Sequence, residues 1–139
     1  MRVLITDVRE ADGFIQVDFD SVIGSGRARW GGGGKQRAPR SGLEYSVEIN
    51  LHEDPDGFAL ARAEEYVSRI ELHGEHWHVN GRVEGVDEDG VFYLRVGSGQ
   101  YDSISVILEP VNGSVAEGEW LVAKTKLIVL YDTGYILHN

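Results

Sequence analysis

Cysteine is absent from the 139 residues of this chain, and so are long apolar runs. Without cysteine there can be no disulfide bond, no thiolate zinc site and no cysteine nucleophile. The same absence favours a cytoplasmic location, because disulfide-rich domains belong to oxidising compartments. No apolar run approaches the roughly 20 residues of a membrane helix, and the first one stops at Asp7, too early for a signal peptide. We therefore expect a soluble cytoplasmic protein with no membrane contact.

Basic residues are scarce, with 13 lysines and arginines against 23 aspartates and glutamates and a net charge of −10. Such a charge opposes binding to nucleic acid and to anionic membranes. Residues 24–42 are the exception, because they contain five basic and no acidic residues together with seven glycines. Glycine is entropically costly to order, so we expect a flexible loop at 24–42. Its candidate binding residues are Arg27, Arg29, Trp30, Lys35, Arg37 and Arg40.

Apolar residues recur mostly at every second position, the period of a strand with one buried face. The clearest case is 43–52, and the other candidate strands lie at 3–5, 14–19, 67–86, 92–96, 104–108 and 120–131. Asp12-Gly13 predicts a hairpin turn, and the alanine-rich and glutamate-rich stretch at 58–66 predicts one short helix. We expect a single β domain over 1–139, all-β with at most one short helix. It would be a small sandwich or a partly open OB-like barrel of about seven to eight strands.

The hairpin at 82–95 has two candidate registers. A two-residue Asp-Gly turn places Glu84 opposite Arg95, whereas a four-residue loop places Arg82 there instead. We prefer the first register because it pairs opposite charges, and it leaves no anion site between two arginines. In either register, the outward residues to test for ligand contact are Arg82, Tyr93 and Arg95.

No catalytic or cofactor-binding motif is complete. The glycine run does not make a phosphate-binding P-loop, because Arg29 and Gln36 stand where the motif needs glycine and a hydroxyl. Sequence frames such as G-x-S-x-G and H-E-x-x-H do not occur. The candidates for a metal site are His73, His76 and His78, although the last two also fit the polar side of a half-buried strand. We predict no cofactor.

Three functional hypotheses follow, in order of preference. The first is a non-enzymatic intracellular domain that binds another macromolecule, preferably a protein. The acidic body of the chain and its basic segment can each contact a partner surface of opposite charge. The second is single-stranded nucleic-acid binding through residues 24–42 and the Arg82, Tyr93, Arg95 face. The third is a metal-assisted enzyme at the histidines. A homo-oligomer stays open, since exposed sheet edges invite pairing.

Overall fold

Strands make up the regular secondary structure of this protein. The computed structural model describes residues 1–31, 38–99, 102–109 and 115–137, and these contain eleven strands. They are β1 (Arg2–Ala11), β2 (Phe14–Ser21), β3 (Gly24–Gly31), β4 (Glu44–Asn50), β5 (Ala59–Arg62), β6 (Arg69–His73), β7 (His76–Val86), β8 (Phe92–Gly97), β9 (Ser103–Leu108), β10 (Trp120–Thr125) and β11 (Val129–Leu137). The predicted all-β fold is confirmed. Over the described ranges there is no helix with the length and apolarity to cross a bilayer.

The predicted short helix at 58–66 is wrong, because β5 forms there instead. Barely two turns of helix are too short to be stable alone, and β10 offers this segment a ladder of backbone hydrogen bonds. Four residues of β5 pair antiparallel with β10, from Ala59 opposite Lys124 to Arg62 opposite Leu121. The strand count accordingly exceeds the predicted seven to eight.

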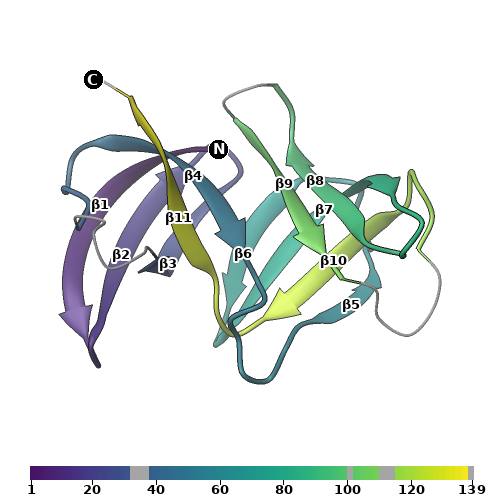
Figure 1. Cartoon of the computed structure of the whole chain (residues 1–139), viewed down its shortest axis with the longest axis horizontal. Helices are drawn as coiled ribbons and strands as arrows, with labels where there is room; N and C mark the ends of the chain where they lie inside the picture. The colour runs from purple at the N-terminus through teal and green to yellow at the C-terminus, as the bar shows by residue number, and fades with distance from the viewer. Residues whose placement is uncertain (32–37, 100–101, 110–114, 138–139) are drawn as a thin grey trace.

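The strands form two sheets that lie side by side (Figure 1). The first is a closed barrel in the order β1-β2-β3-β11-β4, in which β3 and β11 are parallel and β4 pairs back onto β1. The other is a six-stranded sheet in the order β5-β10-β7-β8-β9, with β6 also paired to β7. We call them the barrel and the second sheet. The candidate strands at 92–96 and 104–108 lie in the second sheet, as β8 and β9.

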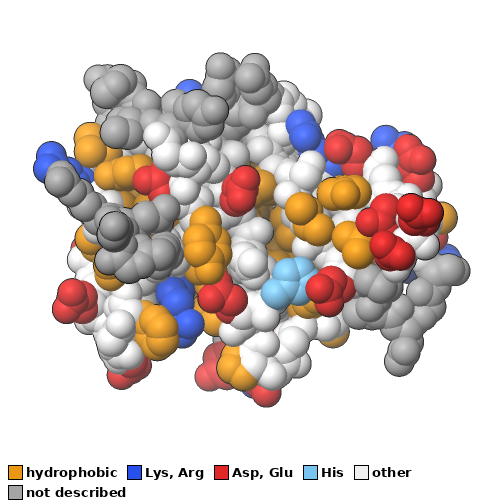
Figure 2. Space-filling model, viewed as in Figure 1, with side chains coloured by type: hydrophobic (Ala, Val, Ile, Leu, Met, Phe, Trp, Pro, Cys, Tyr) orange, Lys and Arg blue, Asp and Glu red, His pale blue; other side chains and the backbone are white. Residues whose placement is uncertain are grey.

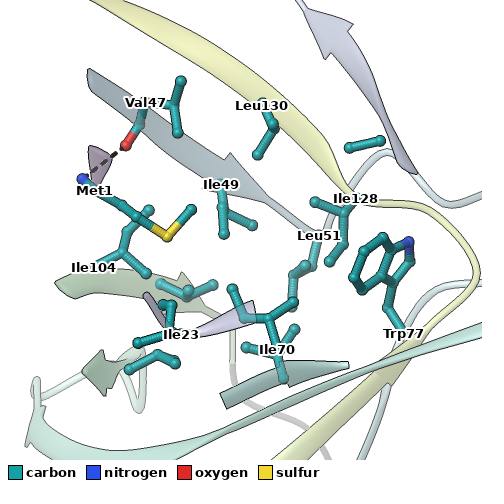
Figure 3. Close-up of a cluster of buried hydrophobic side chains, with 14 of the residues drawn as sticks. Met1, Ile23, Val47, Ile49, Leu51, Ile70, Trp77, Ile104, Ile128 and Leu130 are labelled. Atoms are coloured by element: carbon teal, nitrogen blue, oxygen red, sulfur yellow. Dashed lines mark hydrogen bonds between the residues drawn. The ribbon is translucent and has the colours of Figure 1, made fainter. Parts of the chain in front are cut away.

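Buried side chains from both sheets belong to one apolar cluster. Where the sheets meet, Ile49 and Leu130 of the barrel lie around the same space as Ile70 and Ile104 of the second sheet (Figure 3). A fully buried aliphatic side chain of this size contributes about 1.5–3 kcal/mol relative to an exposed one. Hydrophobic burial is therefore the main attraction between the barrel and the second sheet.

The glycine-rich segment begins as a strand, so the predicted loop is wrong for residues 24–31. A Cβ atom on Gly24 would lie 1.9 Å from the carbonyl oxygen of Ile70, and one on Gly26 would lie 2.4 Å from Cη2 of Trp77. These glycines are needed because the second sheet approaches β3 closely, not because the chain must bend freely. Residues 32–37 of the predicted loop lie outside the described residues, and residues 38–42 form no strand, as predicted.

Two connections between the sheets run next to each other, one from β4 to β5 and one from β10 to β11. Asp54 joins them, because its Oδ2 accepts hydrogen bonds from Thr125 Oγ1 at 2.9 Å and from the Lys126 amide at 2.7 Å. Desolvation raises the pKa of this buried carboxyl, but these donors and the Asp56 amide outweigh it and hold the pKa below its ordinary value. The predicted single strand at 120–131 is therefore split, with one half in each sheet.

Candidate functional site

The arginines at the start of the basic segment have partners on the barrel surface. Arg27 Nε lies 3.4 Å from Asp18 Oδ1, and the Arg29 guanidinium lies 3.7 Å from the centroid of the Phe14 ring. Asp18 Oδ1 also accepts a hydrogen bond from Arg9 Nη2 at 2.8 Å. The hydrogen bond from Arg9 is the main cause that lowers the pKa of Asp18, and Arg27 adds to it. These cations already interact with the protein's own acidic and aromatic side chains.

Trp30 points into the barrel and is only 6% exposed. Its ring lies edge-on to Tyr45, with 5.4 Å between the ring centroids, and its Nε1 has no hydrogen-bond partner among the described residues. The ring therefore has no exposed face on which a nucleic-acid base could stack. Of the remaining candidates in this segment, Arg40 is exposed, and Lys35 and Arg37 lie outside the described residues.

The β7–β8 hairpin adopts neither of the two loops expected from the sequence. Its five-residue loop, 87–91, is closed by Val86 opposite Phe92, and a bulge between Val83 and Gly85 then shifts the register by one residue. As a result Arg82 lies directly opposite Arg95. The preferred pairing of Glu84 with Arg95 is wrong.

The side chain of Asp87 explains the longer loop of this hairpin. Its Oδ1 accepts hydrogen bonds from the amides of Asp89 at 2.9 Å and Val91 at 3.0 Å. An aspartate that binds amides two residues or more ahead offers the backbone an alternative to a tight two-residue turn. The hydrogen bonds of Asp87 thus help to set which residues face each other further along β7 and β8.

A row of outward side chains crosses four strands of the second sheet. Trp120 of β10 lies opposite Arg82 of β7, Arg82 opposite Arg95 of β8, and Arg95 opposite Ser105 of β9. The ring of Tyr66 stacks on Trp120 at 5.9 Å between centroids and an interplanar angle of 20°. Two arginines and two aromatic rings are thereby gathered on the outer face of the second sheet.

The third predicted residue, Tyr93, lies on the same outer face, two residues before Arg95 in β8. It is opposite Ile107 of β9 and is 37% exposed. The predicted residues Arg82, Tyr93 and Arg95 thus share one surface, whereas Arg27, Arg29 and Trp30 belong to the barrel. The structure does not bring the two predicted groups together in one cavity.

The row borders an open cleft of about 670 Å³, which we call the arginine cleft. Its lining includes Val22, Ser68, Arg82, Arg95, Glu117 and Trp120. The β2–β3 turn of the barrel reaches this cleft because the carbonyl of Ile23 accepts a 2.7 Å hydrogen bond from the Ile70 amide. Residues of both sheets therefore form the cleft, and no single local stretch of the sequence contains all of its lining residues.

Charges of both signs line the arginine cleft. Arg95 Nη1 lies 3.9 Å from Glu84 Oε2, and Asp102 Oδ1 of the lining lies 3.2 Å from Nη2 of Arg2, which is outside the lining. Among the described residues no carboxylate lies within ion-pair distance of Arg82. Acidic and hydrophobic side chains are also interspersed over the second sheet, at the right of the view in Figure 2. This mixture suits a partner of mixed charge better than a uniform polyanion.

The histidines cluster at the β6–β7 hairpin without forming a metal site. The rings of His73 and His78 stack at 4.4 Å between centroids, His73 Nε2 lies 2.7 Å from Glu71 Oε2, and His76 lies opposite His73 across the turn. Burial, followed by the positive charges of His73 and Lys124, lowers the pKa of His78. In the part of the chain that the structure describes, no three histidine or carboxylate side chains are placed to hold a metal ion. The metal-assisted hypothesis gains no support from this geometry.

Comparison of the chain with protein-family models, with curated proteins and with solved structures finds no match. The arguments about function therefore come from the site itself. Sequence analysis missed Trp120 and Tyr66, since the first opens a strand expected to be central and the second ends the expected helix. Only the pairing of β10 with β7 could have revealed that Trp120 flanks Arg82.

Proposed function

We propose that this protein is a non-enzymatic intracellular domain that binds another protein through the arginine cleft. The observation that carries the proposal is the row of Trp120, Arg82 and Arg95 across adjacent strands, with Tyr66 stacked on Trp120. Tryptophan, tyrosine and arginine are the residue types that contribute most to protein–protein binding energy. The lack of cysteine supports the intracellular, cytoplasmic part of the proposal.

The exposure of these side chains supports a macromolecular partner. Tyr66 is 76% exposed although its aromatic ring is large and apolar, and Val22, in the lining of the arginine cleft, is equally exposed. Covering them would remove apolar surface from water, which favours association by about 25 cal/mol per Å² before the entropic costs of binding. An exposed ring beside an uncompensated arginine combines apolar and charged contacts in one place.

Site-specific photocrosslinking in cells that make the protein tests this proposal. A p-benzoylphenylalanine in place of Tyr66 should form an adduct with a defined partner protein. The same photocrosslinker in place of Phe14, a half-exposed aromatic on the barrel, is the matched control and should not form it. Equal adducts at both positions, or no protein adduct at position 66, would contradict the proposal.

Single-stranded nucleic acid is the second candidate, because arginines beside stacked aromatic rings also suit bases and phosphates. The net charge of −10 and the carboxylates of the cleft oppose it. An oligonucleotide titration at about 50 mM salt, where phosphate contacts are strong, should show no binding. Binding that is lost in an Arg82→Gln variant would favour the nucleic-acid function over the protein-binding one.

A further inference from the structure

Arg82 has a different environment from Arg69, another arginine of its sheet. Arg69 forms ion pairs with Glu65 at 3.2 Å and with Glu71 at 3.0 Å. Arg82 is exposed, lies between Trp120 and Arg95 in the row, and has no carboxylate partner among the described residues. Two arginines directly opposite each other repel, so a negative group placed between them would relieve that repulsion.

Arg95 is held in a defined orientation next to Arg82. Its Nη2 donates to the carbonyl of Gly99 at 3.1 Å, and its Nη1 donates to Ser105 Oγ at 3.5 Å. These contacts hold the guanidinium over β8 and β9, where Glu84, at 3.9 Å, neutralises it only in part. The guanidinium of Arg95 thus supplies a positive charge at a fixed position. The guanidinium of Arg82 supplies N–H donors that have no partner among the described residues.

The aromatic pair beside Arg82, Tyr66 and Trp120, is also held in place before any ligand binds. Asn80 is buried, and its Nδ2 donates to the carbonyls of Glu65 at 3.0 Å and Val67 at 2.6 Å. These two hydrogen bonds fix the backbone on both sides of Tyr66, whose ring then stacks on Trp120. A second cavity, of about 450 Å³, shares Arg82 and Trp120 with the arginine cleft, so both residues stand on the ridge between two hollows. A site whose parts are held before binding loses less entropy when a ligand arrives.

We propose that Arg82 binds the carboxylate of one acidic side chain in an extended peptide segment of the partner, while Trp120 and Tyr66 pack against an apolar residue next to it. The inference rests on the proposed function and specifies its ligand. A guanidinium with free donors pairs well with a carboxylate. The neighbouring Glu84 and Glu117 repel further anions, which restricts the segment to a single acidic residue at this point and disfavours a run of phosphates.

Selection from a random peptide display library on the immobilised protein tests the inference. Enriched peptides should share one aspartate or glutamate next to an aromatic, aliphatic or proline residue. A synthetic copy of an enriched peptide can be titrated by tryptophan fluorescence. Trp30 and Trp77 are 6% and 3% exposed, so the peptide-dependent change reports on Trp120. Replacing the acidic residue of the peptide with its amide should weaken binding about tenfold, the size expected for a hydrogen bond to a charged group.

Variants of the protein separate the inference from the proposed function. Arg82→Gln should weaken the peptide about tenfold, Arg82→Lys should weaken it less, and Arg27→Gln on the barrel should leave it unchanged. Enriched peptides that need Trp120 but bind equally to the Arg82→Gln variant would overturn the inference and leave the proposed function standing. The absence of enriched peptides, or peptides that bind a Trp120→Ala variant equally well, would count against both.

Discussion

Arginines of the barrel differ from Arg82 of the second sheet in whether the fold gives them partners. On the barrel, Arg9 and Arg27 contact Asp18, and Arg29 lies over Phe14. On the second sheet, Arg82 has no carboxylate partner in the described part of the chain and stands beside an exposed aromatic pair. Arg27 and Arg29, which lie in the segment that is most basic in sequence, are therefore less available to a partner than Arg82. A binding site is better located by the charges that the fold leaves uncompensated.

The two regions differ in closure as well. The barrel returns from β4 to β1, whereas β5 and β9 are the terminal strands of the second sheet. Unpaired strand edges invite association. For a homo-oligomer formed by edge pairing, which the sequence leaves open, β5 and β9 are candidate edges.

The largest expected effect tests whether the barrel depends on the second sheet for its stability. A Cβ atom in a Gly24→Ala variant would collide with the backbone of Ile70, so we expect a loss of about 3 kcal/mol or failure to fold. Gly85→Ala is the control, because the nearest atom to its Cβ is Tyr93 Cδ2 at 3.9 Å. Urea unfolding of both variants measures the difference, and equal losses would contradict the close approach of β3 and β6.

The next effect concerns the connections between the two regions. Asp54→Asn should lower the free energy of unfolding by about 2 kcal/mol at neutral pH, because donors bind both Oδ1 and Oδ2 of Asp54 and an amide has only one acceptor oxygen. The pKa of Asp54 is lower in the folded state, so its stabilisation is present above the unfolded-state pKa and is lost as the pH falls through the folded-state pKa. The difference between variant and wild type should therefore shrink towards acidic pH. A difference that does not change with pH would contradict this account.

A smaller effect should appear on the barrel surface. Asp18→Asn should cost less than about 1 kcal/mol, because its ion pairs are partly exposed and screened by solvent. The pKa of Asp18 is lowered by Arg9 and Arg27, so this contribution too is present at neutral pH and is lost in acid. Added salt should reduce it. Asp20 is an exposed aspartate on the same strand that has no ion pair within the described residues, and the control variant Asp20→Asn should show no such salt effect.

The smallest effect completes the comparison. Arg82→Gln should change the free energy of unfolding by no more than about 0.5 kcal/mol, because the variant loses no ion pair within the described residues. Arg9→Gln, which loses its contacts with Asp7 and Asp18, should be less stable than Arg82→Gln in the same urea titration. If the two variants were equally destabilised, the contrast between barrel and second sheet would not hold.

Local sequence patterns predict the strands correctly where one or two adjacent turn residues determine the backbone conformation. Asp12-Gly13 forms the predicted hairpin turn, with positive φ at both residues. The candidate strand at 67–86 is interrupted by a turn at Gly74, which has positive φ and separates β6 from β7. In these places the turn residues and the alternation of side chains act over a few positions.

The register of β7 and β8 shows where such patterns fail. The Asp-Gly pair favours a tight turn, but the hydrogen bonds of Asp87 and a bulge beside Glu84 produce another pairing. A shift of one residue changes every cross-strand neighbour. The register favoured by the sequence leaves no anion site between Arg82 and Arg95, whereas the structure places these two residues opposite each other.

By itself the sequence determined that this chain folds into strands around an apolar interior, because period-two alternation specifies which side chains each strand buries. The tertiary structure decided which charges remain without partners. Trp120 meets Arg82, and the β2–β3 turn meets the second sheet, across dozens of intervening residues. Alternation assigns a side chain to a face, but only the pairing of distant strands determines its neighbours on that face.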